Sequence, residues 1–275
     1  MKRFGSKLLA GPYVIWMLVF TVIPLFLILY NAFTTGSGAF TMDNVLAIAD
    51  PVNAGPLWLS LRMSVVITLV CLLLAFPLAM ILRRHSSNKN SFIVLIFILP
   101  MWMNFMLRTL AWRLIFLNNG FLNAFLQTLG LGKIYLMNTK TAIIIGTAYD
   151  YFPFMVLPIY NALVKIPDDV INAAKDLGAG WGYILRRIII PLSLPGVVSG
   201  ITMVLVPSMS EFVIASMLGG GKVYLIGNVI EQAFNSGYAD THLGSGLSLS
   251  LMGLIIISMV IYRFFDRGEE ENVLW

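Results

Sequence analysis

Two acidic residues, Asp150 and Glu211, stand inside long apolar stretches of the sequence. A charged side chain is costly inside a membrane, so such residues are candidates for a functional site. Tyr151 directly follows Asp150, and Trp102 stands in a third apolar stretch, within PMWMN (100–104). Carboxylates attract ammonium groups, and aromatic rings attract cations and cover methylene chains. These four residues therefore predict a pathway for an organic cation.

The same residues also have a structural interpretation. Each acid could instead pair with Arg108, with Arg113 or with a backbone N–H group, and so hold helices together. Trp102 stands near the expected outer end of its stretch, where tryptophan commonly anchors a helix at the membrane surface. Both interpretations stay open at the level of the sequence.

A second set of charged residues lies at 165–196, between two apolar stretches. Pro167 is placed like a first-turn residue, and Asp168 and Asp169 then favour the positive end of a helix. The apolar residues of this helix recur three and four positions apart and predict one stripe: Val170, Ala173, Ala174 and Leu177.

Gly178 and Gly180 are expected to end this helix. A second amphipathic helix is expected at 181–190, stopping at Pro191. A helix pair outside the bilayer, fixed to a membrane helix at each end, is suited to pass force to a partner in water. The alternative is an interfacial amphipathic loop that only anchors its neighbours.

The composition defines the elements that must position these residues. The chain of 275 residues is 59% hydrophobic and 11% charged, with a mean hydropathy of +0.86, which excludes a soluble globular protein. Apolar runs of about 20 residues predict spanning helices. The predicted fold class is an all-α integral membrane protein, one domain over 1–275, with six transmembrane helices at about 11–33, 57–82, 92–110, 141–163, 192–216 and 245–262.

The first run is too long for a signal peptide and lacks a small-residue cleavage site, so it is expected to stay as a span. The basic residues set the expected orientation. With the N-terminus inside, 12 of the 18 Lys and Arg residues fall on the inner side. Because basic residues concentrate on the cytoplasmic side, both termini and the segment 165–190 are expected in the cytoplasm.

No catalytic or metal-binding motif stands out in the sequence. GGGK (219–222) lacks the full phosphate-loop pattern. His85 and His242 stand at opposite ends of the expected topology, and Cys71 is the single cysteine, so neither a metal site nor a disulfide framework is expected. We expect no enzyme activity and no cofactor in this chain, and no nucleic-acid partner.

The segment NAAKDLGA (172–179), followed by Pro191 and Pro195, resembles the "EAA" loop of bacterial ABC importer permeases. The resemblance implies a coupling helix that docks into a groove on a cytoplasmic ATPase subunit. One departure is that the family's leading glutamate is asparagine here, which puts a salt bridge from this position in doubt. The residues expected to contact the ATPase are Asn172, Ala173, Ala174, Asp176, Gly178, Ala179 and Gly182.

Further segments resemble B-type permeases of spermidine/putrescine ABC importers, within the methionine-importer-like type I permease family. The resemblance covers about 10–265 and implies the type I ABC importer permease fold. It implies a heterodimer with a C-type permease, two copies of an ATPase that binds ATP and Mg, and an extracytoplasmic polyamine-binding protein, in the bacterial inner membrane. Glu211 falls where family members often carry an acid. The matching segments are 99–112, 118–126, 176–200 and 210–230.

Two other classes of function remain open. An ABC permease for sulfate, molybdate, iron, phosphonate or sugar would share the coupling loop, and its buried acids would be structural. A secondary transporter usually shows inverted repeats, of which we find no clear sign, and a membrane scaffold would leave the coupling loop without a role. We therefore expect a permease subunit that forms, with a second permease, a polyamine pathway coupled to an ATPase by alternating access.

Overall fold

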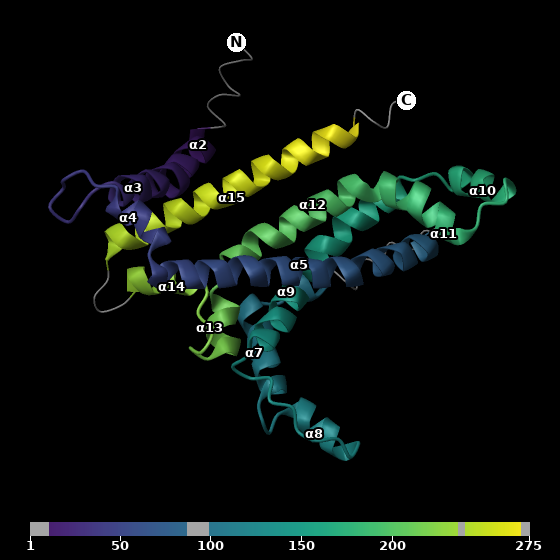
Figure 1. Cartoon of the computed structure of the whole chain (residues 1–275), viewed down its shortest axis with the longest axis horizontal. Helices are drawn as coiled ribbons and strands as arrows, with labels where there is room; N and C mark the ends of the chain where they lie inside the picture. The colour runs from purple at the N-terminus through teal and green to yellow at the C-terminus, as the bar shows by residue number, and fades with distance from the viewer. Residues whose placement is uncertain (1–10, 87–98, 236–239, 271–275) are drawn as a thin grey trace, which may run out of the picture. The chain divides into compact units, whose positions relative to one another are not determined.

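The computed structural model describes residues 11–86, 99–235 and 240–270. Within these ranges the chain is almost entirely helical and contains no strand, only one isolated bridge between Thr34 and Phe40 (Figure 1). The predicted all-α membrane fold is thus confirmed for the described residues. Five of their helices are long and apolar enough to cross a membrane: Gly11–Ala32, Pro51–Arg84, Lys140–Val164, Trp181–Met209 and Thr241–Val260.

The third predicted span, at 92–110, lies partly outside the described residues. Its described part is not one helix, because η3 (Leu99–Trp102) ends and α7 (Phe105–Phe116) begins after Asn104. The Asn104 side chain accepts hydrogen bonds from the backbone N–H groups of Met106, at 2.8 Å, and Leu107, at 3.3 Å. This N-cap satisfies donors that a helix start leaves unpaired, so a new helix begins inside the predicted run.

The chain divides into two compact units. The first, unit 1, contains Met1–Leu57 and Val229–Ser258, and the second, unit 2, contains Trp58–Asn228 and Met259–Trp275. Helix α5 (Pro51–Ser86), helix α14 (Ile226–Asn235) and helix α15 (Thr241–Glu270) each have residues in both units. The two units are described separately below.

In unit 1, the segments α2 (Gly11–Met17), η1 (Leu18–Val22) and α3 (Ile23–Ala32) follow one another as an uninterrupted apolar helix. Asn44, in α4 (Asp43–Leu46), donates side-chain hydrogen bonds to the carbonyl groups of Asn31, Ala32 and Thr34 at 3.0–3.4 Å. Carbonyl groups at the end of a helix lack partners within it, so this asparagine stabilises the end of α3. The turn η2 (Ala47–Ala49) then leads into α5.

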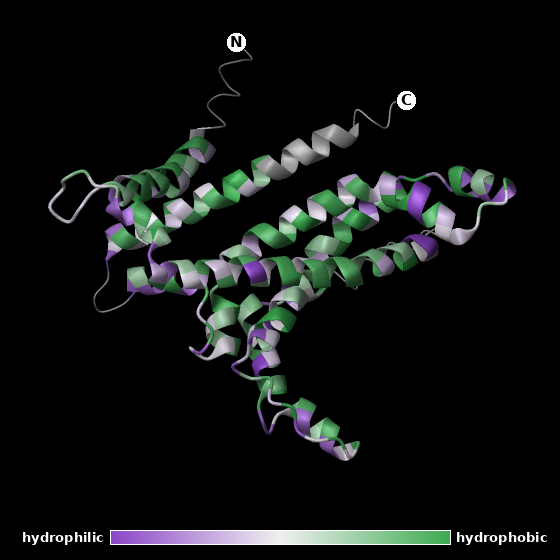
Figure 2. Ribbon diagram, in the orientation of Figure 1, coloured by the Kyte–Doolittle hydropathy of each residue, from purple (hydrophilic) through white to green (hydrophobic). Residues whose placement is uncertain are grey.

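Unit 2 is built on three long helices: α5, α9 (Lys140–Val164) and α12 (Ile190–Met209). Apolar residues cover α5 and α12 along most of their length (Figure 2), and the outward side chains include Leu73, which is 72% exposed. A helix that is apolar on its exposed side is suited to contact lipid. Shorter helices, α7, α8 (Phe121–Thr128) and α13 (Val213–Gly219), complete the unit.

Two glycines let α9 and α12 approach closely. A Cβ atom at Gly196 would lie 2.5 Å from both the Ala162 Cβ and the Pro158 carbonyl oxygen of α9. A Cβ atom at Gly200 would lie 2.8 Å from the Met155 sulfur. Small residues allow such contact between the backbones of membrane helices, where packing rather than the hydrophobic effect drives association.

The helix that contains the predicted fifth span differs from the prediction at both ends. The predicted stop at Pro191 is wrong, because α11 (Trp181–Ile184), η4 (Leu185–Ile189) and α12 form one continuous helix. A π turn precedes the proline, and the Ile190 N–H group donates to the Leu185 carbonyl. This local change of register accommodates a residue that has no N–H group. At the other end α12 stops at Met209, before the predicted end at Ser216.

We predict that Gly196→Ala destabilises the protein, because the added methyl group meets the α9 backbone at Pro158, which has no flexible side-chain end to move aside. Overpacking of this kind costs about 1–3 kcal/mol and corresponds to a melting temperature lower by roughly 2–8 °C. The measurement is thermal unfolding of the purified protein in detergent. Gly253→Ala is the matched control, since a Cβ atom there has nothing within 4 Å, and an equal loss in both variants would contradict the prediction.

Candidate functional site

Two of the predicted pathway residues, Tyr151 and Glu211, meet inside unit 2. The Tyr151 hydroxyl donates to Glu211 Oε2 at 3.0 Å. Glu211 Oε1 accepts the backbone N–H of Ile214, in the first turn of α13, at 3.0 Å. Glu211 is buried, yet both carboxylate oxygens have a donor. The acid therefore stabilises the start of α13, which explains why the chain leaves the helical conformation after Met209.

Asp150, in α9, lies beside Arg108 of α7. Asp150 Oδ1 and Arg108 Nη1 are 3.2 Å apart, and the two side chains are 2% and 10% exposed. Despite this ion pair, neither Asp150 oxygen has a hydrogen-bond partner among the described residues, and neither do Arg108 Nε and Nη1. The pair is thus held by charge without hydrogen bonds of good geometry, whereas buried charges are usually hydrogen-bonded as well. Its buried polar atoms therefore keep unused hydrogen-bonding capacity.

The two contacts together form a cluster of Arg108, Asp150, Tyr151 and Glu211, joined by the adjacency of Asp150 and Tyr151 in α9. Two carboxyl groups stand against one guanidinium group, so the cluster favours a cation over an anion. The Tyr151 ring also lies 6.3 Å from the Phe154 ring, centroid to centroid, which adds aromatic surface. The cluster is compatible with both interpretations of the acids that the sequence left open. Each acid has a structural partner, and the two acids together carry more negative charge than Arg108 can neutralise.

Trp102 does not join this cluster. It lies at the end of η3 and is 76% exposed, so its ring is not available inside unit 2. A position on the surface agrees better with the alternative of an anchor at the membrane boundary. Among the described residues, no group of three or more His, Cys, Asp or Glu side chains is placed to hold a metal ion.

Two polar residues that the sequence analysis did not single out lie in this part of unit 2. Thr147, one turn before Asp150 on α9, is buried, and its hydroxyl has no partner among the described residues. Asn228 donates to the Phe212 carbonyl at 3.0 Å and to the Ser216 hydroxyl at 2.8 Å, and so fixes the chain just after Glu211. In the sequence, Asn228 stands out as the one polar side chain within the apolar run LIGNVI (225–230), which could have indicated a buried hydrogen-bonding residue.

The predicted coupling segment forms α10 (Asp168–Asp176), and Gly178 ends it as expected. Gly178 has a φ of +81°, its N–H donates to the Lys175 carbonyl at 2.8 Å, and the Ala179 N–H donates to the Ala174 carbonyl at 2.9 Å. This is the pattern of a Schellman turn, in which the left-handed position favours glycine.

Gly180 does not end α10, contrary to the prediction, but begins the next helix. Its carbonyl accepts the N–H groups of Tyr183, at 3.0 Å, and Ile184, at 3.1 Å, and it stands at the N-cap of α11. Pro167 likewise stands at the N-cap of α10 rather than in its first turn. The reason is the same in both cases: the residue has an extended backbone, with ψ of 157° or 140°, while its successor is already helical.

The start of α10 is fastened to the end of α5 by one arginine. Arg83 Nη2 donates to Asp168 Oδ1 at 2.9 Å and to the Ile166 carbonyl at 2.8 Å. The arginine side chain is largely buried, whereas the aspartate is exposed. The guanidinium group thus holds both the acid of the first turn and the backbone that leads into it.

The predicted apolar stripe of α10 points away from unit 2. Leu177 is 89% exposed, and Val170 and Ala173 are exposed too, whereas Ile171 makes the buried contact. An exposed apolar surface of this kind is typical of a docking site for another protein. Of the predicted coupling residues, Ala174 and Ala179 are half-buried, and the others are exposed: Asn172, Ala173, Asp176, Gly178 and Gly182.

Comparisons with a family model and with individual known proteins agree on one family. A family described as "Binding-protein-dependent transport system inner membrane component" matches residues 72–270. The spermidine/putrescine transport system permease protein PotB of Haemophilus influenzae is 34% identical over 255 residues, which are 90% of this chain and 89% of that protein. PotB of Escherichia coli K12 is also 34% identical, over 90% of this chain and 92% of its own.

Solved structures show the same fold at low sequence identity. One chain of a bacterial alginate ABC transporter, crystallised in complex with an alginate pentasaccharide-bound periplasmic protein, superposes with a TM-score of 0.71 and 15% identity. The match covers 97% of this chain and 95% of that one. The fold of this chain is therefore that of an ABC importer permease.

We predict that Arg108→Gln strongly destabilises the protein, because it leaves Asp150 buried without its cation. Removing one partner of a buried ion pair costs about 3–5 kcal/mol. Thermal unfolding in detergent measures the loss, and the double variant Arg108→Gln/Asp150→Asn should recover most of it. Arg113→Gln, at an exposed position of the same helix, is the control. A double variant as unstable as the single one would contradict this account of the pair.

Proposed function

The chain belongs to the family of binding-protein-dependent transport system inner membrane components, and we propose that it is the permease subunit of a polyamine importer. The observation that carries this proposal is the 34% identity to PotB along nearly the whole of both chains. The name of those relatives states spermidine and putrescine as the cargo of their transport system. Both compounds are organic cations, the class of substrate that an acidic and aromatic cluster suits.

The buried cluster gives each residue a role in this proposal. Asp150 and Glu211 supply negative charge for the ammonium groups, and the Tyr151 ring covers the methylene chain between them. In the structure Arg108 and the Tyr151 hydroxyl occupy these carboxylates. An entering polyamine therefore replaces contacts that are already made, which limits the strength with which it is held and favours its release.

The exposed stripe on α10 is the proposed contact with the ATPase. The stripe enters the groove of an ATPase subunit through Leu177, Val170 and Ala173. ATP and Mg are bound by the ATPase and not by this chain. ATP binding closes the ATPase dimer and moves α10, and the helix Trp181–Met209 moves with it, so that access alternates between the two sides. The further partners are a C-type permease and an extracytoplasmic polyamine-binding protein.

The proposed orientation places both termini and α10 in the cytoplasm. It rests on the distribution of basic residues, 12 of 18 of which fall on that side. The proposed membrane is the bacterial inner membrane, and the description of the family names an inner membrane component.

We predict that the purified complex of this chain with its ATPase, its second permease and its binding protein hydrolyses ATP faster when spermidine or putrescine is added. The measurement is phosphate release from the complex in lipid nanodiscs, with sulfate and a sugar as control solutes. Stimulation by polyamines alone supports the proposed substrate. A complex that assembles but responds to another solute would support the assignment as a permease subunit and contradict polyamines as its substrate.

Substituting Glu211 separates a role in cation binding from a role in the fold. Glu211→Gln keeps an oxygen for the Ile214 N–H but removes the charge, whereas Tyr151→Phe removes the hydrogen bond and keeps the charge. We expect Glu211→Gln to raise the spermidine concentration for half-maximal stimulation by at least about tenfold, since loss of a charged hydrogen-bond partner costs roughly 1.5–3 kcal/mol. Tyr151→Phe is the control for stability. If both variants lose only thermal stability, Glu211 is structural.

We predict that Leu177→Asp prevents co-purification of the ATPase while the permease stays folded. Leu177 is 89% exposed, so the substitution removes almost no internal contact and places a charge at one end of the exposed stripe. The readout is the amount of ATPase retained on a tagged permease. Val52→Asp is the control, because Val52 is an exposed apolar residue far from α10 in the sequence. Retention of the ATPase by Leu177→Asp would contradict docking at this stripe.

A further inference from the structure

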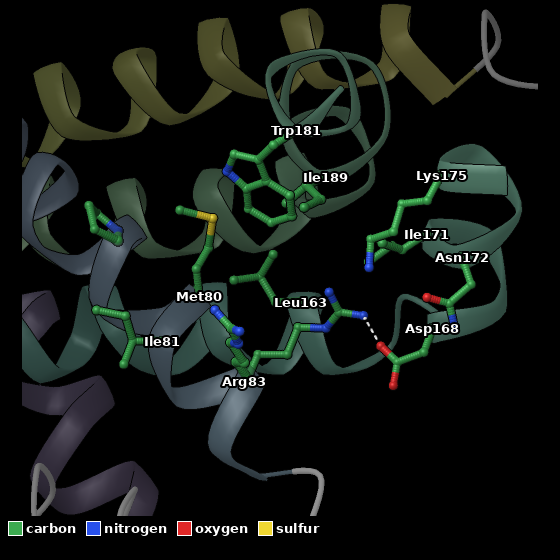
Figure 3. A pocket seen from close by; sticks show the side chains of 12 residues that line it. Met80, Ile81, Arg83, Leu163, Asp168, Ile171, Asn172, Lys175, Trp181 and Ile189 are labelled. Atoms are coloured by element: carbon green, nitrogen blue, oxygen red, sulfur yellow. Dashed lines mark hydrogen bonds and ion pairs between the residues drawn. The ribbon is translucent and has the colours of Figure 1, made fainter. Parts of the chain in front are cut away.

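A pocket of about 680 Å³ lies in unit 2, and α10 lines one side of it (Figure 3). Its residues come from the last turns of α5 and α9, from α10, and from the helix Trp181–Met209. The pocket thus lies at one end of three apolar helices that are long enough to cross a membrane. The end of a spanning helix is where a ligand can contact both water and lipid headgroups.

The rim of the pocket is strongly basic. It contains Arg83, Arg84 and Lys175 against the single acid Asp168. Arg83 is already bonded to Asp168 and to a backbone carbonyl, whereas Arg84 and Lys175 have no ion pair or hydrogen bond among the described residues. Figure 3 shows the Lys175 ammonium group directed from α10 into the pocket. Within the described part of the chain, two cations therefore have no partner, beside a third that is fixed in place.

The floor of the pocket is apolar. Met80, Leu163 and Ile189 line it, and the ring of Trp181 closes one side. Tryptophan is enriched at the membrane–water boundary, where its ring contacts lipid and its N–H group contacts water. A basic rim above an apolar floor fits an amphiphile with an anionic head and a hydrocarbon chain. Basic pockets between membrane helices on the cytoplasmic side bind anionic lipid headgroups.

The position of α10 connects this pocket to the docking stripe. Asp168, Ile171 and Lys175 are spaced three and four residues apart, so they share the helix face that lines the pocket. Val170, Ala173 and Leu177 share the opposite face, because about 100° of rotation per residue places them roughly half a turn away. A ligand in the pocket therefore supports α10 from behind the surface that meets the ATPase.

We propose that this pocket binds the phosphate headgroup of an anionic phospholipid from the cytoplasmic leaflet, and that the bound lipid holds α10 in position for docking. Arg84 and Lys175 bind the phosphate, Arg83 keeps the helix start in place, and the apolar floor contacts an acyl chain. The assignment to the cytoplasmic leaflet and the effect on docking rest on the proposed function. The lipid site itself does not depend on which solute is transported.

Native mass spectrometry of the detergent-purified complex tests the site directly. The wild-type complex should retain added phosphatidylglycerol, and the double variant Arg84→Gln/Lys175→Gln should retain roughly 25-fold less, since each of the two basic residues at an anionic surface contributes about fivefold. Both side chains are exposed, so the fold should tolerate the changes. The control is Arg186→Gln/Arg187→Gln, which removes two exposed charges of the same helix pair outside this pocket. Equal retention in all three complexes would overturn the proposal.

ATP hydrolysis in nanodiscs tests the consequence. Adding phosphatidylglycerol to phosphatidylcholine nanodiscs should raise polyamine-stimulated hydrolysis in the wild type and the control, and have little effect on the Arg84→Gln/Lys175→Gln complex. If inorganic phosphate without the lipid gives the same activation, the ligand is a free anion and the lipid proposal is wrong. If lipid retention depends on Arg84 and Lys175 but no polyamine stimulates the complex, the lipid site stands and the proposed substrate fails.

Discussion

The close approach of α9 and α12 at Gly196 and Gly200 is the contact on which both candidate sites depend. It leaves no room for a single methyl group between the two backbones. The chain leaves α9, forms α10 and returns into the helix Trp181–Met209, so the two ends of α10 are fixed by helices that are fixed to each other. The same pair carries Asp150 and Tyr151 on one helix and leads to Glu211 just after the other. The packing at these two glycines thus determines where the buried acids lie relative to the exposed stripe of α10.

Glu211 shows how one residue serves both the fold and the proposed transport. Its two oxygens accept one hydrogen bond from the backbone of α13 and one from the Tyr151 hydroxyl. The backbone bond explains the break after Met209, and the side-chain bond can be exchanged for another donor without loss of that break. Asp150 differs from Glu211, because Arg108 compensates its charge while neither of its carboxylate oxygens accepts a hydrogen bond from a described residue. The two acids therefore differ in what a cation would have to displace.

Local chemistry made some of these features predictable and long-range contacts hid others. Hydropathy was sufficient to predict a helical membrane protein. Gly178, which follows DDVINAAKDL, was sufficient to predict the end of α10, because the left-handed backbone conformation there depends on this residue. The continuation through Pro191 was not predictable, since a π turn in the preceding residues absorbs the missing donor. The stripe of α10 was found, but not its direction, because Ile171 rather than Leu177 contacts unit 2. The exposure of Trp102 was not predictable for a similar reason, since the sequence does not give the exposed fraction of a side chain.

The unbroken helix from Trp181 to Met209 has a mechanical consequence. Its 29 residues span about 44 Å at 1.5 Å per residue, from beside α10 to within two residues of Glu211. Gly196 and Gly200 hold this helix against α9, so a tilt of the whole helix has its pivot at that contact. Its far end lies nine residues, about 14 Å, beyond Gly200, and a tilt of roughly 10° displaces that end by about 2 Å. A displacement of this size is sufficient to break the 3.0 Å hydrogen bond between the Tyr151 hydroxyl and Glu211.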